Sequence, residues 1–492
     1  MGRIFLISLL IFTFVFNLDI AVKNIIRPTG IQEPGVYSPR VQIKNETAEE
    51  GTVAVYLKIF QFPNQNLVYL DTSSTTISGN ATITIDFEPF NAQIGIYVVK
   101  CSLSAINDTN PLNDTLSSKL RIWEIPLNQW LLWDSVPLGA SRKKVKSGGG
   151  MVDGSVQNEK RIFLMKGNKT NEFYLYEPIF NEWSKRCSIP YSLLNPKYLP
   201  RKGSCLAKAG QFIYLAVGNN TCEFLAYDLI GDSWTKKRPI PLGPENKALK
   251  GGSALAKGKI LNKDYLFLIK GSNTREFYAY DLANDTWLAL APTPYLERET
   301  RIKKGSCLTS DGRNIYLLKG GVNEFFIYFP DSNKWQPLKP MPFYNRYGQK
   351  KKVKEGAALV YENGHDVIFA FKGGNTNEFW VYFVNGDSWH ELPSLPLPPS
   401  NKKVKDGAAL LLFAGGLFAL KGNNTNEVWF FKYDFPLPFS AIKEAKLIKK
   451  ERSLKLTSPL FDIIGRKVKV LKKGIYFDLE AKKIKKLLSA KF

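Results

Sequence analysis

Lysine and glutamate side chains recur at a regular spacing through the middle of this chain. Each of five lysines stands five or six residues before a glutamate, and a sixth glutamate has no such lysine. The lysines are Lys166, Lys270, Lys319, Lys372 and Lys421, and the glutamates are Glu172, Glu223, Glu276, Glu324, Glu378 and Glu427. Such groups can form ion pairs within hairpins, and an ammonium group on a loop can also bind an anionic ligand. Because a binding site usually breaks the symmetry of a repeat, we favour ion pairs over direct ligand contact, and both interpretations stay open.

Few residues of this chain are suited to catalysis. It has only two histidines, His365 and His390, which excludes a metal site built from several histidines. The Gly-x-Ser-x-Gly motif of a nucleophilic serine is absent from the sequence. We therefore expect no enzyme, no metal and no cofactor, although two carboxylates that meet only in the folded chain cannot be recognised from the sequence.

The charged residues belong to a segment that occurs six times with a period of about fifty residues. An aromatic residue follows each glutamate by four positions, at Tyr176, Tyr227, Tyr280, Tyr328, Tyr382 and Phe431. Five copies continue with a Trp and then a Pro, each seven positions further on, at Trp183/Pro190, Trp234/Pro241, Trp287/Pro294, Trp335/Pro342 and Trp389/Pro396. This period is typical of propellers and solenoids, in which one unit buries its apolar face only against its neighbours.

The sixth copy lacks its Trp, and a matching segment lies upstream of the first copy. There Trp130 stands seven residues before Pro137, in the register of the other copies. A ring needs such a displaced strand, because the last blade then borrows its outer strand from the start of the domain and leaves no unpaired edge. We predict that this segment pairs with residues 428–431 and that residues 124–440 form a closed six-bladed β-propeller. The repeated Trp side chains, Trp130 included, are expected to pack at the blade edges.

Each copy contains four segments of strand composition. In the fourth copy these are a small apolar strand at 305–309, a hydrophobic strand at 314–319, an aromatic-rich strand at 324–329 and a Trp-containing strand at 334–338. This pattern resembles the kelch repeat over residues 124–440, which implies a β-propeller acting as an interaction platform. The Gly-Gly pair that usually follows the second kelch strand is kept only at Gly320-Gly321 and Gly373-Gly374.

The N-terminus and the cysteines indicate the compartment. Arg3 precedes an apolar run at 4–16, which predicts a signal peptide over residues 1–18, with an uncleaved anchor as the alternative. A secreted or cell-surface protein is expected, without a transmembrane span once the signal is removed. The five cysteines are odd in number and form no disulfide framework. Cys205 and Cys307 stand where other copies have Ala, so we interpret them as small buried residues.

Residues 19–123 have the pattern of about seven short alternating strands separated by turns, which favours an immunoglobulin-like β-sandwich. The order of the segments at 41–45, 95–98 and 107–114 resembles the bacterial cell-adhesion-related immunoglobulin-like (CARDB) domain, which implies an extracellular spacer or adhesive module. The 107–114 loop is rich in oxygen ligands and could bind calcium. A hairpin held by Asx turns is the favoured interpretation, because the spacing of an EF-hand is missing.

The last segment, residues 441–492, is strongly basic, with 16 Lys plus Arg against 5 Asp plus Glu. Within it, Asp462, Gly465 and Arg466 followed by Gly474 and Tyr476 resemble the C-terminal sorting domain of type IX secretion substrates over residues 454–490. The resemblance implies export from a bacterium with two membranes. A small β-hairpin domain is the alternative interpretation.

Charge and topology together suggest where a ligand binds. The chain carries a net charge of +24, and counting by segment leaves +14 on residues 124–440. This favours anionic partners, although a lysine-rich composition could also reflect adaptation to heat. Nucleic acid is not expected for an exported protein. In a four-stranded blade, the hairpin between the second and third strands and the loop to the next blade lie on one face, and here both are basic, for example at 142–146, 351–354 and 402–405.

Two functions remain from these observations. The first is a secreted or cell-surface, non-enzymatic binding or adhesion protein whose propeller contacts a surface protein or an anionic glycan. The second is a hydrolase or lyase acting on an anionic polysaccharide. Carboxylates in the face loops of one copy that the other five lack would favour the enzyme, and because these loops look uniform in sequence we favour binding.

Overall fold

The computed structural model describes residues 18–156 and 160–435, together with three short strands at 461–462, 474–478 and 483–487. The predicted signal peptide lies outside these residues, apart from Leu18. The described chain is all-β, as predicted: its regular elements are strands, apart from two 3-10 turns, η1 (Pro196–Tyr198) and η2 (Pro330–Ser332). No helix in the described part of the chain combines the length and the apolar character needed to cross a membrane.

The N-terminal part contains two main sheets that share one apolar core. The first sheet has the order β1-β4-β7, formed by β1 (Ile20–Arg27), β4 (Arg40–Asn45) and β7 (Thr82–Asp86). The second has the order β2-β10-β9-β5-β6, formed by β2 (Gly30–Gln32), β10 (Thr115–Ile122), β9 (Gly95–Ala105), β5 (Gly51–Phe62) and β6 (Asn66–Ile77), and a short pair joins β3 (Gly35–Tyr37) to β8 (Phe90–Ala92). Along β5 buried residues alternate with more exposed ones, because successive side chains of a strand point to opposite faces. Val41 and Ile43 of one sheet and Val55 and Leu57 of the other belong to the same buried cluster, an arrangement compatible with the predicted β-sandwich.

Six four-stranded antiparallel sheets follow. Sheet 1 is β12 (Gly150–Asp153), β13 (Ile162–Met165), β14 (Phe173–Glu177) and β15 (Glu182–Lys185); sheet 2 is β16 (Cys205–Ala209), β17 (Phe212–Ala216), β18 (Phe224–Asp228) and β19 (Ser233–Lys236). Sheet 3 is β20 (Ala254–Ile260), β21 (Lys263–Ile269), β22 (Phe277–Asp281) and β23 (Thr286–Ala289); sheet 4 is β24 (Cys307–Ser310), β25 (Ile315–Leu318), β26 (Phe325–Phe329) and β27 (Lys334–Leu338). Sheet 5 is β28 (Ala358–Glu362), β29 (Val367–Phe371), β30 (Phe379–Phe383) and β31 (Ser388–Leu392). Sheet 6 is β32 (Ala409–Phe413), β33 (Gly416–Leu420), β34 (Glu427–Phe431) and, from far upstream, β11 (Trp130–Ser135).

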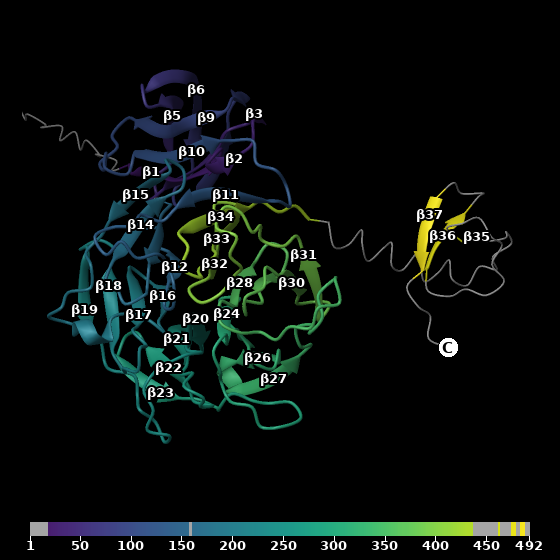
Figure 1. Cartoon of the computed structure of the whole chain (residues 1–492). Helices are drawn as coiled ribbons and strands as arrows, with labels where there is room; N and C mark the ends of the chain where they lie inside the picture. The colour runs from purple at the N-terminus through teal and green to yellow at the C-terminus, as the bar shows by residue number, and fades with distance from the viewer. Residues whose placement is uncertain (1–17, 157–159, 436–460, 463–473, 479–482, 488–492) are drawn as a thin grey trace, which may run out of the picture. The chain divides into compact units, whose positions relative to one another are not determined.

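The predicted pairing of the displaced segment is observed. β11 runs antiparallel to β34, with Trp130 opposite Phe431 and Ser135 opposite Glu427. The first strands of the sheets lie around a common centre, where each contacts the first strand of the next sheet and β12 contacts β32 (Figure 1). The arrangement is propeller-like, and it places the first strands innermost.

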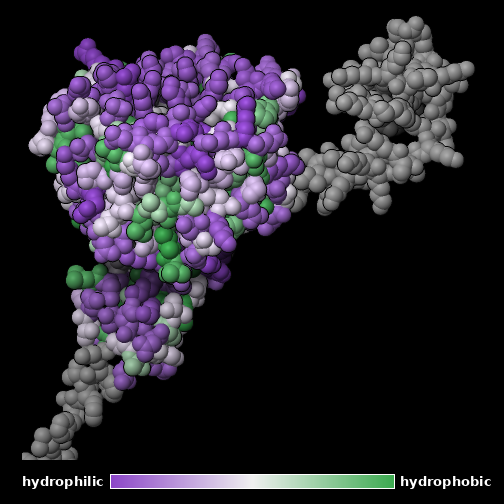
Figure 2. All heavy atoms as spheres, turned by 90° about the horizontal axis from the view of Figure 1, so that it is seen from below, coloured by the Kyte–Doolittle hydropathy of each residue, from purple (hydrophilic) through white to green (hydrophobic). Residues whose placement is uncertain are grey.

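Burial explains the composition of the strands. The second strands, such as β13 and β29, are buried along their whole length because each sheet is covered on both faces by its neighbours, so they read as continuous apolar runs. The fourth strands, such as β15, are largely exposed and polar. The surface seen in Figure 2 is accordingly mostly hydrophilic, with hydrophobic residues in small separate patches.

The C-terminal part forms a separate compact unit, residues 434–492. In it, β35 (Phe461–Asp462), β36 (Gly474–Asp478) and β37 (Lys483–Leu487) form an antiparallel sheet with Phe461 opposite Phe477. Most other residues of the predicted sorting-like segment lie outside the described part of the chain, so that resemblance stays a prediction.

Candidate ligand-binding site

The five repeated lysines are buried ion-pair partners of the repeated glutamates. The Nζ–Oε2 distances are 2.7 Å for Lys166–Glu172, 2.8 Å for Lys270–Glu276, 3.2 Å for Lys319–Glu324 and 2.6 Å for Lys372–Glu378, and Lys421 pairs with Glu427 in the same way. All five lysine side chains are 0% exposed. The ion-pair interpretation therefore fits the structure. Direct ligand contact does not fit it, because none of these five ammonium groups is exposed.

Four of the five buried lysines, all except Lys372, also donate a hydrogen bond to a carbonyl of a neighbouring loop. Lys166 Nζ donates a hydrogen bond to Leu138 O at 2.5 Å, and Lys319 Nζ donates to Pro294 O at 2.6 Å. Burial raises the pKa of Glu172, but hydrogen bonds from Lys166 and Ser141 outweigh it and hold the pKa below its ordinary value. Burial lowers the pKa of Lys319 against the opposing effect of Glu324. The pair thus ties the hairpin to the loop that arrives from the previous sheet.

Sheet 2 departs from this pattern. Val217 occupies the lysine position and is fully buried, and Glu223 instead pairs with the half-exposed Lys236 at 3.1 Å. Glu223, the glutamate without a repeated lysine, therefore lies at the surface.

The repeated Trp side chains join adjacent sheets, as expected for packing elements. Trp234 Nε1 donates to Cys187 O of sheet 1's outgoing loop at 2.8 Å, and Trp335 and Trp389 make equivalent bonds to Ala291 O and Lys339 O. Trp183 donates to the Asp134 carboxylate, and Trp287 to Arg238 O. Trp130 takes the same role in sheet 6: its Nε1 donates to Pro393 O at 3.0 Å, and its ring lies 4.9 Å from those of Phe379 and Phe431.

The residues that line the central pocket form six equivalent turns, which we call the axial turns. They are residues 146–149, 201–204, 250–253, 303–306, 354–357 and 405–408, each just before the first strand of a sheet. The third position is always glycine with φ between +83° and +93°: Gly148, Gly203, Gly252, Gly305, Gly356 and Gly407. In five turns the N–H of the fourth residue donates to the carbonyl of the first, as in Gly149 N to Lys146 O at 2.8 Å, and with a left-handed third residue this is a type II turn.

Glycine is required at these positions for a second reason. A Cβ on Gly148 would lie 2.2 Å from Arg201 O of the next turn, and a Cβ on Gly356 would lie 2.2 Å from Lys405 O. The series continues around the centre until Gly407 meets Lys146 O of the first turn at 2.1 Å. Backbone therefore packs against backbone from turn to turn. Sequence reasoning missed these six glycines, although the repeated basic-x-Gly motif before each first strand could have revealed them.

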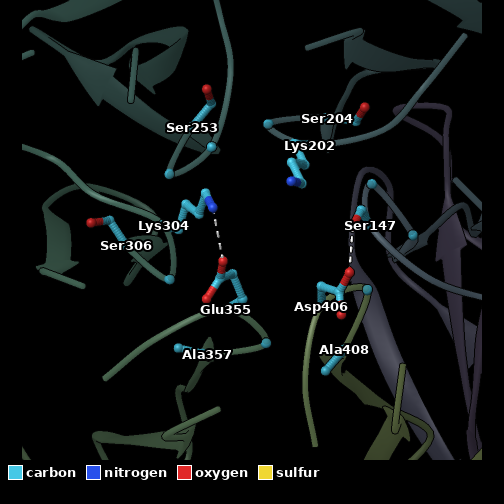
Figure 3. Close-up of a pocket in the computed structure, with 18 residues that line it drawn as sticks. Ser147, Lys202, Ser204, Ser253, Lys304, Ser306, Glu355, Ala357, Asp406 and Ala408 are labelled. Atoms are coloured by element: carbon cyan, nitrogen blue, oxygen red, sulfur yellow. Dashed lines mark hydrogen bonds and ion pairs between the residues drawn. The ribbon is translucent and has the colours of Figure 1, made fainter. Parts of the chain in front are cut away.

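The second position of the axial turns differs from sheet to sheet. It is Ser147, Lys202, Gly251, Lys304, Glu355 and Asp406 in order, and these residues line a pocket of about 140 Å³ (Figure 3). Lys304 Nζ lies 3.3 Å from Glu355 Oε1, and the Ser147 hydroxyl donates to Asp406 Oδ2. The expectation that the face loops are uniform was wrong at this position, because two neighbouring sheets carry carboxylates that the others lack. This difference at the second position is hard to recognise in the sequence, because a basic residue precedes it and a glycine follows it in each copy.

The hairpins that carry the buried lysines lie on the same face as the axial turns. Asn168 N donates to Ser147 O, and Thr376 pairs with Val404 of the following loop. Valine in the basic loops points inward, since Val145, Val353 and Val404 are at most 1% exposed, whereas the lysines beside them are exposed. This supports the assignment of hairpins and connecting loops to one face.

The N-terminal sheets contact the opposite face. Lys119 Nζ lies 2.6 Å from Oε2 of Glu177, the last residue of β14, and Arg121 donates to Pro178 O in the turn that follows. Gly30 approaches Ala414 in the turn after β32. Both turns lie at the strand ends remote from the axial turns, so the N-terminal sheets leave the pocket face free.

The histidines and the acidic 107–114 loop make local contacts. His365 Nδ1 contacts Glu362 at 2.9 Å within one turn, and burial followed by nearby Lys339 lowers the pKa of the half-buried His390. Within the described ranges, no group of three or more His, Cys, Asp or Glu residues is placed to hold a metal ion. In the 107–114 loop, Asp108 accepts a hydrogen bond from Asn110 N, which is the Asx-turn arrangement, and its other oxygen accepts one from Ile20 N of β1. The five cysteines are free thiols.

Comparisons with known proteins give matches to solved structures only. No protein-family model matches this sequence, and no curated protein matches it. Among the solved structures that match, the structure of YjhT has 13% identity and a TM-score of 0.42, and the match covers 61% of this chain and 96% of YjhT. An auxiliary nutrient binding protein from Bacteroides thetaiotaomicron VPI-5482 has 8% identity and a TM-score of 0.41, covering 84% of this chain and 97% of that protein. At these values neither similarity bears on what this chain binds, and the kelch and CARDB resemblances stay predictions.

Proposed function

We propose that this chain is a secreted or cell-surface binding protein, without enzymatic activity, that takes up its ligand at the axial pocket. In this proposal residues 124–440 form a closed six-bladed kelch-like propeller, residues 19–123 act as a CARDB-like spacer, and residues 441–492 direct export. The partner is a surface protein or an anionic glycan.

The observation that carries the proposal is the construction of the axial turns. Their first and third positions repeat in all six sheets, while the second position, which lines the pocket, carries four different side-chain types besides glycine. A repeated frame with variable side chains at its centre is what a selective binding site needs, because a ligand has no sixfold symmetry. The contact of the N-terminal sheets with the opposite face supports the same assignment, since these sheets do not cover the pocket.

A pocket-filling substitution tests this proposal. Gly251 is the one second position without a side chain, and a Cβ there meets mainly the flexible side chain of Lys304. We expect full-length Gly251→Trp to lose binding on glycan arrays and in pull-downs from bacterial envelope fractions. Gly386→Trp, in the turn between β30 and β31 on the opposite face, is the matched control and should bind like the wild type. Absence of any ligand above background, or equal binding by both variants, would contradict the proposal.

One observation favours the alternative of a polysaccharide hydrolase or lyase. Glu355 and Asp406 are neighbouring carboxylates in the pocket, and paired carboxylates are the usual acid and base of glycoside cleavage. Incubation of the full-length protein with uronic-acid and sulfated polymers, followed by product analysis, tests this function. Product that disappears in Glu355→Gln and Asp406→Asn would establish the enzyme, and absence of product would exclude it for these polymers.

A further inference from the structure

The axial pocket is surrounded by exposed cations. The first residue of every axial turn is basic and exposed: Lys146, Arg201, Lys250, Lys303, Lys354 and Lys405. None of these six side chains forms an ion pair or a hydrogen bond with another described residue. Six unpaired cations around one opening create a positive potential that attracts anions and raises their local concentration.

The backbone of the axial turns adds hydrogen-bond donors. In five turns the carbonyl of the second residue accepts a bond from the hairpin of its own sheet, for example Ser147 O from Asn168 N at 2.9 Å and Asp406 O from Asn423 N at 3.0 Å. Because a trans peptide directs its carbonyl and its N–H to opposite sides, the N–H of the following glycine points away from the hairpin. These glycines line the pocket, and within the described residues none of their six N–H groups has an acceptor. An anion on the axis would supply one.

The pocket carries a positive charge on one side and negative charges on the other. The Lys202 side chain extends into the pocket and has no hydrogen-bond or ion-pair partner in the described chain (Figure 3). Glu355 and Asp406 lie on the other side, held by Lys304 and Ser147. Carboxylates only accept hydrogen bonds, so this side fits a ligand group that donates them. The pocket therefore fits a group with a negative charge at one end and hydroxyl donors at the other.

The surrounding face carries exposed aromatic rings. Five tyrosines between 37% and 76% exposed lie on the loops that lead into sheets 2, 4 and 5: Tyr191, Tyr198, Tyr295, Tyr344 and Tyr347. Tyrosine offers a large, rigid contact surface with a polar tip, and it is enriched where proteins bind their ligands. The pocket has room for one charged group with its adjacent hydroxyls, so a longer ligand would extend from it onto the surrounding face.

We propose that the axial pocket binds an acidic sugar residue of an oligosaccharide. Its carboxylate or sulfate lies against Lys202 and the glycine N–H groups, and its hydroxyls donate to Asp406 and Glu355. This inference rests on the proposed function, since it assigns the chemistry of the same pocket.

Isothermal titration of the full-length protein tests the inference with four probes. Tetragalacturonate supplies carboxylates, a chondroitin sulfate tetrasaccharide supplies sulfate, maltotetraose is the neutral control, and citrate is an anion without sugar hydroxyls. We expect one or both acidic tetrasaccharides to bind, with affinity falling as salt rises, and the two acidic probes distinguish carboxylate from sulfate. Citrate should bind at least tenfold more weakly, and maltotetraose should not bind.

Substitutions locate the binding. Lys202→Gln should weaken binding of the acidic tetrasaccharide about tenfold, the usual effect of removing a hydrogen bond to a charged group. Lys259→Gln and Lys334→Gln remove exposed lysines far from the pocket, at the end of β20 and the start of β27, and should change the affinity less than twofold. Equal binding of maltotetraose, binding of neither acidic probe, or equal effects of Lys202→Gln and Lys259→Gln would overturn the inference. If another ligand binds and Gly251→Trp abolishes its binding, the proposed function stands and only the acidic-sugar assignment is wrong.

Discussion

Gly407 packs against Lys146, from opposite ends of the repeat region, so closely that a Cβ on the glycine would lie 2.1 Å from the lysine carbonyl oxygen. The contact brings the sixth axial turn against the first. Its equivalents occur between all other neighbouring turns, so the inner strands are held together by backbone as well as by side chains.

This contact predicts a large effect of one methyl group. Gly407→Ala places a Cβ into the Lys146 backbone and also forces alanine to adopt φ of +85°. We expect a loss of at least about 3 kcal/mol of unfolding free energy in urea titrations. Gly415→Ala is the control, because Gly415 has φ of +78° but open space around it, and it should cost only about 1–2 kcal/mol. Equal losses would show that the close approach has no energetic role.

The buried Lys–Glu pairs predict a strong non-additive effect. Lys372→Val leaves Glu378 buried without its cation and should cost about 3–5 kcal/mol. The double variant Lys372→Val/Glu378→Gln should recover part of this loss, because sheet 2 already has a valine at the lysine position. The exposed pair Lys236–Glu223 is the reference, and Lys236→Ala should cost less than about 1 kcal/mol. A double-mutant cycle by urea unfolding measures the coupling, and additive losses would refute it.

The strand borrowed by sheet 6 depends on Trp130. Trp130→Ala removes a buried ring that contacts Phe379 and Phe431 and a hydrogen bond to Pro393 O, so it should cost about 3–5 kcal/mol. Leu132→Ala, on the same strand but 42% exposed, should cost less than about 1 kcal/mol. Thermal unfolding of both variants checks this, and similar melting temperatures would mean that β11 contributes little.

Acid should remove a contribution made by Asp281. Burial raises the pKa of this carboxyl, but hydrogen bonds from Lys263, Asn284 and the backbone N–H groups of Ala283 and Asn284 lower it to about 2, from 3.8. Because the pKa is lower in the folded state, the stabilisation is complete above about pH 4 and is lost as the pH falls towards 2. We expect Asp281→Asn to lose roughly 1–2 kcal/mol at pH 6, after allowance for the half-exposed Lys263, and less at pH 2.5. Urea unfolding at both pH values measures the difference, and a loss that does not change with pH would contradict it.

Most of the strand pattern could be predicted from the sequence. The register of Trp130 with the five other Trp residues was enough to predict its pairing with β34, because the spacing to Pro repeats in each copy. The hairpin ion pairs could likewise be favoured from their recurrence alone. Their burial, which only the structure shows, favours ion pairs over direct ligand contact, because the lysine side chains are wholly enclosed.

The candidate site could not be predicted in the same way. Its residues are one per sheet and are separated along the sequence by about one repeat length, so no local motif brings Lys202 near Asp406. The second position of the axial turns varies, but the residues on either side of it are the same in each copy. The doubled glycine of the kelch pattern belongs to the hairpins and not to these turns. There, asparagine replaces the second glycine at Asn168 and Asn423, both with φ of +53°, because asparagine tolerates left-handed backbone.

Each axial turn combines repeated framework positions with one variable position, and this affects how ligand specificity can change. Since the backbone of the first residue and the glycine of each turn maintain the frame, the intervening side chain can be exchanged without rebuilding the scaffold. Single substitutions at these six positions would therefore change which ligand the same fold binds.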